Sequence, residues 1–400
     1  MKSLRDRIVW LGILLIFMFL NIKYIDKGPI STHIWAQADH YAIAIGFVDN
    51  NLDFFHPKTY CLNPQFGALK LKKNEEYWTV IPENPEGITA IDFPIHHYFV
   101  ACIMKLLGSK EPIIFRFYTF ILSFIGLFFL FKSSLLINGS KEWSFFMLAF
   151  VMLAPTFNFY AANFLPSSFA LSTLFIALFY FIKYSNNYKI SEFYYSIFFL
   201  TLSALVRFPF LIYHIALICT YIVSLIYLRK KFLKEILGVS VGLFVVLLYF
   251  IYNKFYLSYN FGSNFLSYPL PPKDFIDFID SIYRTFLHAA GRYLTLIHYI
   301  LLAVLLYVFI KNKLFINLLK YNFVLFLLAF QLLGVTLYSF LMVRQFPGHD
   351  YYFLDTYFPL IIITLLLYSK QFLKVAKFNH RAFIFGSVVL AFIVNRIIFK

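Results

Sequence analysis

The chain has 400 residues, of which 61% are hydrophobic, 22% aromatic and only 14% charged. A soluble domain needs more polar side chains than this to cover its surface, so the composition excludes an ordinary globular protein and indicates an integral membrane protein. The net charge of +16 does not indicate a nucleic-acid-binding protein, because the Lys and Arg residues fall in small groups between apolar runs and not on one face.

The first apolar run is long enough to cross a bilayer, which requires about 20 mostly apolar residues. It has no small-residue cleavage site, so it predicts a retained first helix and not a cleaved signal peptide. Together with the runs that follow, the candidate spans are 8–25, 112–131, 143–160, 165–182, 192–208, 209–228, 235–253, 293–310, 321–342, 351–369 and 382–398. The sequence therefore predicts an all-α polytopic membrane protein of about 11 transmembrane helices, organised as a single domain over 1–400.

Basic residues concentrate in every second connection between these runs. The six basic groups are Lys2, Arg5 and Arg7; Lys132 and Lys141; Lys183 and Lys189; Arg229, Lys230, Lys231 and Lys234; Lys311, Lys313 and Lys320; and Lys370, Lys374, Lys377 and Arg381. Since short cytoplasmic loops are enriched in Lys and Arg, we expect these groups and the N-terminus in the cytoplasm. Two long segments, 26–111 and 254–292, are then expected outside the cell (inner) membrane.

The first long segment contains two apolar stretches that are too short to be comfortable spans, 34–48 and 93–107. The apolar residues at helical spacing in the first stretch are Ile34, Ala38, Tyr41, Ala42 and Ile45. Both stretches predict helices that lie along the membrane surface with an apolar face in lipid. The alternative for 93–107 is a true span, which would invert the topology of everything downstream and break the pattern of basic loops.

Asp39 lies in the first of these stretches, in the sequence Trp35-Ala36-Gln37-Ala38-Asp39-His40-Tyr41. A carboxylate at the membrane surface, partly desolvated by aromatic neighbours, has a raised pKa and can accept a proton from a hydroxyl or an amine. Trp35, Gln37 and His40 are candidates to contact an acceptor or to support the carboxylate. The simpler interpretation of Asp39 is a solvated acid in a helix.

The second stretch begins with Asp92-Phe93-Pro94-Ile95-His96-His97-Tyr98. Adjacent side chains point about 100° apart on a helix, so His96 and His97 cannot hold one metal from this helix alone. We predict no metal site, and the sequence leaves open whether a divalent metal takes part. Either imidazole binds a phosphate or anchors the helix at the level of the lipid headgroups. Asp92 and His97 are further candidates to contact an acceptor.

A third group of polar residues lies in the short turn Arg344-Gln345-Phe346-Pro347-Gly348-His349-Asp350-Tyr351-Tyr352. A cation, an imidazole and a carboxylate at the water interface are suited to binding an anionic headgroup. A polar turn with interfacial tyrosines is the alternative.

Three arginines map to the outer side, against the usual bias of basic residues. A buried guanidinium near the bilayer costs roughly 2.5–3.5 kcal/mol, so each one needs an anionic partner. We expect Arg284 and Arg292 to pair with one of Asp274, Asp277 and Asp280. Arg207 has no acid near it in the sequence, so we expect it to meet a lipid phosphate.

Several motifs are missing, and the cysteines are few. There is no Walker loop, dinucleotide fingerprint, HExxH, GxSxG or DxD pair, so a soluble nucleotide donor is not expected. Three cysteines, Cys61, Cys102 and Cys219, do not make a disulfide framework or a metal knuckle. A disulfide between Cys61 and Cys102 stays open.

The order of these segments resembles that of the GT-C membrane glycosyltransferases, in particular glycosyltransferase family 39, with the bacterial relatives of protein O-mannosyltransferases and of the lipid A aminoarabinose transferase. The likeness covers most of the chain as an architecture, and Ala36 departs from the Arg that many bacterial members have there. The segments that carry it are His33-Ile34-Trp35-Ala36-Gln37-Ala38-Asp39, then Phe93-Pro94-Ile95-His96-His97-Tyr98 with Lys105-Leu106-Leu107-Gly108, then Ala154-Pro155 with Asn163-Phe164-Leu165-Pro166, and Gly348-His349-Asp350-Tyr351-Tyr352.

The resemblance implies an enzyme that takes a sugar from a polyprenyl-phosphate carrier and transfers it, with inversion, to an acceptor outside the cytoplasm. Asp39 inherits the role of catalytic base, while Arg207, Arg344, His349 and His96 are the expected phosphate-binding residues. No cofactor is expected, membrane lipids are expected as further partners, and the acceptor is not specified. The alternatives are a polysaccharide polymerase or ligase that uses diphosphate-linked glycans, and a lipid-linked sugar transporter or flippase, which tends to place charged residues near mid-membrane.

Overall fold

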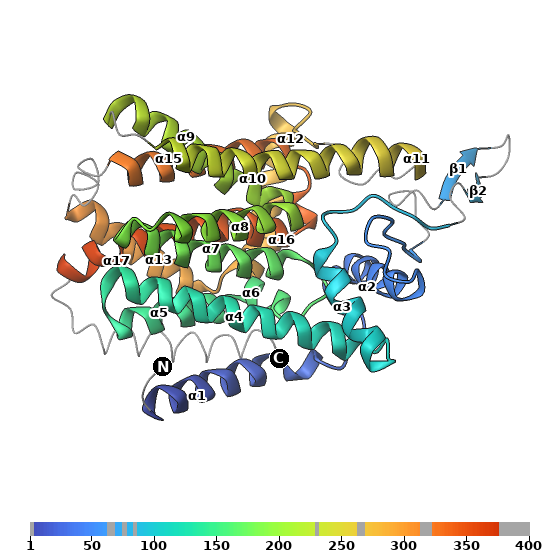
Figure 1. Ribbon diagram of the computed structural model, residues 1–400, viewed down its shortest axis with the longest axis horizontal. Coiled ribbons are helices and arrows are strands. Elements are labelled where there is room, and N and C mark those ends of the chain that lie inside the picture. The colour runs from blue at the N-terminus through green and yellow to red at the C-terminus, as the bar shows by residue number, and fades with distance from the viewer. Residues whose placement is uncertain are drawn as a thin grey trace.

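The computed structural model describes seven stretches of the chain. They are 4–61, 69–73, 78–82, 86–228, 232–261, 269–312 and 322–375. Most of the long helices run side by side in one bundle, and α2 (Ile34–Asp49), α3 (Ile95–Leu107) and a short β-hairpin lie together at one end of it (Figure 1). We call this the α2 end of the bundle.

Helices that are long and apolar enough to cross a membrane occur seven times in the described residues. They are Arg7–Tyr24, Pro112–Asn138, Ser167–Asn187, Phe208–Tyr227, Leu233–Phe261, Phe323–Leu341 and Tyr351–Lys370. Two further apolar helices of the bundle, α8 (Ile190–Val206) and α13 (Leu296–Lys311), are shorter. The chain is therefore a mostly helical, polytopic membrane protein, as the sequence predicts. The total of eleven spans stays a prediction, and the last one, 382–398, lies outside the described residues.

The remaining long helices of the bundle follow the predicted spans closely. They are α1 (Leu4–Asn21), α4 (Pro112–Asn138), α7 (Ser167–Asn187), α9 (Leu211–Leu228), α10 (Leu233–Ile251), α15 (Asn322–Leu341) and α17 (Tyr357–Val375). α17 is preceded by the short helix α16 (Tyr351–Asp355), which contains the last two residues of the polar turn 344–352.

The predicted span 143–160 is wrong as a single helix. It is divided into α5 (Lys141–Met152) and α6 (Pro155–Tyr160), both largely buried. Pro155 has no backbone N–H to donate to the preceding turn, so it cannot continue α5, but it fits the first turn of a new helix. The break changes the direction of the chain and carries Tyr160 toward the α2 end.

α2 packs differently from the predicted surface helix. Its buried side chains include Ile43 and Phe47, which pack with Ile91 and Ala101 of the segment that leads into and forms α3. Ile34, one of the residues expected to face lipid, is 52% exposed, but the opposite face is buried in protein. α2 is therefore an integral part of the α2 end and not a helix held only by the bilayer.

α3 has two distinct faces. One face, with Val100 and Met104, packs against α2 and α4, while the other leaves Phe99, Leu106 and Leu107 exposed at 46%, 84% and 61%. With 13 residues it is too short to be counted among the seven spans. The placement of this exposed apolar face in lipid stays a prediction.

Two regions contain secondary structure that the sequence did not predict in detail. An antiparallel hairpin of β1 (Leu69–Lys73) and β2 (Trp78–Pro82) projects beyond α2, so the chain is not purely helical (Figure 1). The segment predicted as a second loop, 254–292, contains the end of a π-helix (Tyr252–Ser258), the short α11 (Tyr259–Phe261) and the long α12 (Phe275–Tyr293).

Gly46 allows a close approach that shapes the α2 end. A Cβ at this position would lie 2.0 Å from the carbonyl oxygen of Lys58. Only glycine lets the segment 57–61 lie directly on α2, because any side chain would occupy the same space. This contact brings Cys61 to the neighbourhood of Asp39.

Candidate functional site

Most of the residues that the sequence singles out gather at the α2 end of the bundle, although they come from distant parts of the chain. The contributing segments are the start of α2, residues 92–97 at the start of α3, Arg207 between α8 and α9, and 344–355 before and in α16. They form three groups of buried polar side chains.

The first group is built around Arg207. Its Nε donates to Oδ2 of Asp355 at 2.9 Å and its Nη2 donates to the same oxygen, while its Nη1 donates to Oδ2 of Asp92 at 3.3 Å. The side chains are 11%, 0% and 6% exposed for Arg207, Asp355 and Asp92. Arg207 follows the last residue of α8, where Pro209 starts a new turn. We call these three residues the Arg207 cluster.

Arg207 has two acidic partners, although no acid lies near it in the sequence. Asp92 and Asp355 lie 115 and 148 residues away in sequence, so no local pattern could have revealed them. The internal ion pairs satisfy the guanidinium, and Arg207 is not the free phosphate-binding cation that we expected.

The charges in the Arg207 cluster do not balance. Two carboxylates share one guanidinium, so the cluster carries one excess negative charge when both acids are ionised. Burial raises the pKa of Asp92 to about 6; the charge of Arg207 opposes this shift and that of Asp355 adds to it. Asp92 is thus a carboxyl group that can hold a proton near neutral pH.

The second group joins His33, Asp350 and Tyr160. Nε2 of His33 lies 3.0 Å from Oδ1 of Asp350, and the Tyr160 hydroxyl donates to the same oxygen at 2.5 Å. His33 has a left-handed backbone with φ of 55°, which is uncommon outside glycine and marks a constrained position. The sequence pointed to Asp350 but missed the two partners, and only the break before α6 explains how Tyr160 reaches it.

Aromatic rings surround the second group. The ring of His349 lies parallel to that of His33, with 6.1 Å between centroids, and edge-on to Trp35 at 5.6 Å. The Tyr351 ring lies 5.5 Å from the ring of His33 and 5.4 Å from the guanidinium carbon of Arg207. Tyr351 therefore links the second group to the Arg207 cluster.

The third group consists of histidines. Nδ1 of His40 and Nε2 of His97 are 2.9 Å apart and share a hydrogen bond, with the two rings stacked at 5.0 Å. His96 is completely buried against the rings of Phe115 and Phe169. Burial holds the pKa of His40 and His96 well below the usual range and lowers that of His97 to about 3.

The enclosure of His96 decides its role. The side chain is 0% exposed and its ring packs against aromatic rings, so a lipid phosphate cannot reach it. The prediction that His96 binds the lipid phosphate is therefore wrong. His40 and His97 stay neutral near pH 7, but their hydrogen bond ties α2 to α3 beside Arg207.

Asp39 is buried on a different face of α2 from His40. Its side chain is close to the thiol of Cys61, which donates a hydrogen bond to it. Burial raises the pKa of Asp39 and the hydrogen bond lowers it by less, while burial and the Asp39 charge together raise the pKa of Cys61 to about 12. No salt bridge joins Asp39 to a cation among the described residues. Cys61 and Cys102 are both free thiols, so the disulfide left open above does not form.

The side chain of Gln37 holds the loop before α2 in place. Its amide nitrogen donates to the carbonyl oxygens of Ile30 and Thr32, both at 2.7 Å, and its amide oxygen accepts from Arg116 at 3.3 Å. Arg116 also donates to the carbonyl oxygens of Lys27, Gly28 and Ala162. Sequence reasoning missed Arg116, which fixes the loop before α2 against α4.

Several other basic residues that the sequence singles out contact acids or carbonyl groups within the protein. Arg344 Nε lies 3.4 Å from Asp277 of α12, and Nδ1 of His349 donates to the carbonyl oxygen of Gln345 at 2.8 Å. Arg284 pairs with Asp280 at 2.8 Å, which confirms that expectation. Arg292 forms no such pair with an acid in the described parts of the chain, contrary to its expectation. Arg344 and His349 remain at the rim of the site.

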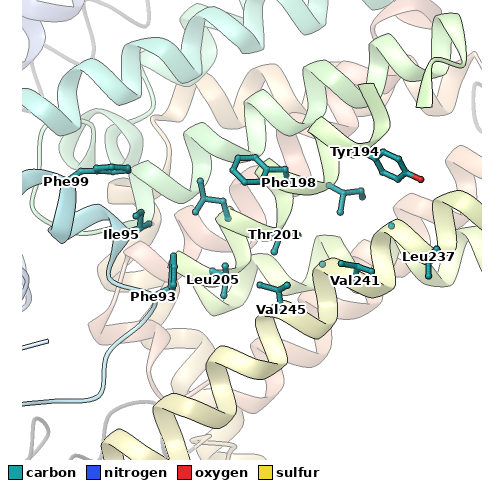
Figure 2. A pocket seen from close by; sticks show the side chains of 14 residues that line it. Phe93, Ile95, Phe99, Tyr194, Phe198, Thr201, Leu205, Leu237, Val241 and Val245 are labelled. Atoms are coloured by element: carbon teal, nitrogen blue, oxygen red, sulfur yellow. The ribbon is translucent and has the colours of Figure 1, made fainter. Parts of the chain in front are cut away.

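The surface of the helix bundle contains an apolar groove. It has a volume of about 750 Å³ and lies between α8 and α10, where Leu205, Val241 and Val245 line it. Figure 2 shows Phe93, Ile95 and Phe99 closing one end of the groove. Phe93 directly follows Asp92, so this end of the groove adjoins the chain segment that carries one acid of the Arg207 cluster.

The site offers proton-transfer groups and an apolar groove, and the described residues contain no group of three or more His, Cys, Asp or Glu arranged to hold a metal ion. In comparisons with known proteins, no family model, no curated protein and no solved structure matches the chain.

Proposed function

We propose that the protein is a membrane glycosyltransferase that moves a sugar from a polyprenyl-phosphate carrier to an acceptor at the α2 end of the bundle. The observation that carries this proposal is an apolar groove with Phe93 at one end, the residue that follows the buried acid Asp92. A long isoprenoid chain is a suitable occupant of an apolar groove between two membrane helices, because burial of apolar surface there needs no polar partners. Its phosphate would then lie at the end of the groove.

The reaction that we propose is a single displacement. A hydroxyl or amine of the acceptor attacks the anomeric carbon, the bond to the phosphate oxygen breaks, and the polyprenyl phosphate leaves. Asp39, which resembles the family's catalytic aspartate, takes the acceptor proton, and its raised pKa suits it to this role. Arg344 is the cation that we assign to the phosphate. His349 is near it in the chain, but burial lowers the pKa of its ring and its Nδ1 already donates to the carbonyl oxygen of Gln345, so it is not a second cation. We place the α2 end on the outer face of the cell membrane, in agreement with the distribution of basic loops.

Transfer by purified protein in lipid nanodiscs tests this proposal. Undecaprenyl-phosphate-linked glucose, mannose, galactose and aminoarabinose are supplied one at a time, with a cell-envelope extract as acceptor. Asp39→Asn should reduce turnover by about 10²- to 10⁴-fold, which is the usual contribution of a general base. Asp53→Asn is the matched control, because Asp53 is an exposed acid that pairs with His56.

The same assay decides between the alternatives. Use of diphosphate-linked oligosaccharides but of no monophosphate-linked sugar would identify a polymerase or ligase. Movement of intact lipid-linked sugar across vesicles, without a covalent product, would identify a transporter. Full activity of Asp39→Asn on a monophosphate-linked sugar would remove Asp39 from the mechanism.

A further inference from the structure

The Arg207 cluster holds its two acids unequally. Asp355 accepts two hydrogen bonds from Arg207 on one oxygen, whereas Asp92 accepts a single longer one of 3.3 Å from Nη1. One guanidinium can neutralise one carboxylate, so the second carboxylate is the member that takes up a proton in a buried site. Its weaker contact makes Asp92 that member.

Asp92 directly precedes a residue that lines the groove. That residue is Phe93, and Tyr249 of α10 donates to the backbone carbonyl oxygen of Ile91 at 3.0 Å and so fixes this segment. The titratable or charged groups that face Asp92 are Arg207, Asp355, Tyr249, Tyr338 and Tyr352. Arg207 is the only cation among these five, so they offer no second positive charge to hold Asp92 ionised.

We propose that Asp92 is a second catalytic residue, a general acid that gives its proton to the phosphate oxygen as the sugar leaves. This inference rests on the proposed function and assigns a role that the resemblance does not supply. In its neutral form Asp92 removes the excess negative charge of the Arg207 cluster, which would otherwise repel a phosphate at the end of the groove.

The proposed step balances. The acceptor forms a bond to the anomeric carbon while the bond from that carbon to the phosphate oxygen breaks, and its electron pair stays on that oxygen. Asp39 receives the acceptor proton, and Asp92 releases its proton to the phosphate. A monoester phosphate has a second pKa of about 6, so the leaving phosphate can accept this proton near neutral pH.

Turnover of the Asp92 variants tests the role directly. We expect Asp92→Asn to lower kcat by about 10²- to 10⁴-fold, with the KM for the lipid donor changed by less than about threefold. The wild type should lose activity as the pH rises and Asp92 ionises, and this decline should persist in Asp92→Glu but not in Asp92→Asn. A purely structural role of Asp92 would not move this limb of the pH profile. Undiminished kcat in Asp92→Asn would overturn the proposal.

Binding of undecaprenyl phosphate provides a test that does not depend on transfer. Isothermal titration calorimetry at pH 7 in buffers of different ionisation enthalpy measures the protons taken up on binding. We expect the wild type to take up close to one proton per lipid, Asp280→Asn to match it, and Asp92→Asn to take up less than half as many. Equal uptake in all three would overturn the role of Asp92. If the wild type shows this uptake but transfers no sugar, the proposed function fails while the proton-binding role of Asp92 stands.

Discussion

Arg207 donates two hydrogen bonds to a single carboxylate oxygen of Asp355, a residue 148 positions further along the chain. The contact joins the turn between α8 and α9 to the last residue of α16. Because Tyr213 of α9 also donates to the backbone carbonyl oxygen of Thr356 at 2.5 Å, this part of α16 is held from two sides. The pair therefore fixes the geometry of the site as well as its charge.

Replacement of Asp355 by Ala should destabilise the site. Arg207 would lose both of its hydrogen bonds to Asp355 and keep only the longer one to Asp92, and a hydrogen bond to a charged group contributes about 1.5–3 kcal/mol. We expect a marked fall in the midpoint of thermal unfolding in detergent, measured by intrinsic fluorescence. Asp280→Ala is the control, because its pair with Arg284 is exposed and such pairs contribute only about 0.3–0.5 kcal/mol. Equal midpoints for the two variants would contradict the structural role of Asp355.

Gly46→Ala should loosen the segment 57–61 from α2. The new Cβ would lie 2.0 Å from the carbonyl oxygen of Lys58, so the segment must move, at a cost of about 1–3 kcal/mol. Cys61 would then react faster with a maleimide reagent, as followed by mass spectrometry. Gly12→Ala in α1 meets no atom within 4 Å and should leave both stability and labelling unchanged or slightly improved. Slow labelling in both variants would show that the segment tolerates the side chain.

The sequence predicted the membrane helices better than their interruptions. Long apolar runs such as 112–131 and 165–182 identify spans because the bilayer requires length and apolarity, which are local properties. Pro155 is visible in the sequence, but it stands within a continuous apolar run that is long enough to be a single span. A proline is tolerated within or between membrane helices, so the sequence alone does not say which applies.

The site was predicted only in part because its partners are distant in sequence. Asp92, Arg207 and Asp350 stood out as polar residues between apolar runs, and each does lie at the α2 end. Their pairings depend on how α3, α8 and α16 pack, which no local pattern contains. His96 shows the opposite error, since its position in a polar motif suggested anion binding whereas the fold encloses it among aromatic rings.

Asp92 should make the protein less stable as the pH rises. Its pKa is raised from 3.8 to about 6 in the folded state, so the folded state binds a proton more tightly than the unfolded state. The contribution of Asp92 to the free energy of unfolding is therefore greatest below pH 4. It decreases by roughly 3 kcal/mol in total as the pH rises from 4 through 6. Thermal unfolding in detergent from pH 4 to pH 7 measures this trend.

Asp92→Asn separates this group from all others that titrate in the same range. The variant should lack the decline between pH 4 and pH 6 and should unfold at a higher temperature than the wild type at pH 7. Asp53→Asn, at an exposed acid, should keep the wild-type profile. A variant Asp92→Asn that is less stable than the wild type at pH 7 would mean that the ion pair with Arg207 outweighs the burial of Asp92.

Filling the groove between α8 and α10 should weaken the binding of a lipid phosphate. Val245 lines the groove, so Val245→Trp would occupy part of its 750 Å³ and displace the chain. We expect the Kd for undecaprenyl phosphate in nanodiscs to rise by about tenfold, which corresponds to about 1.4 kcal/mol of lost apolar contact. Microscale thermophoresis with labelled protein measures this change.

Phe244 provides the matched control for this experiment. It is the preceding residue on α10 and is 57% exposed, but it does not line the groove. Phe244→Trp places the same indole on the same helix, about 100° away around its axis. We therefore expect wild-type affinity for the control and reduced affinity for Val245→Trp. Equal affinities would show that the chain binds elsewhere on the bundle, and the groove would lose its proposed role as the site of the lipid chain.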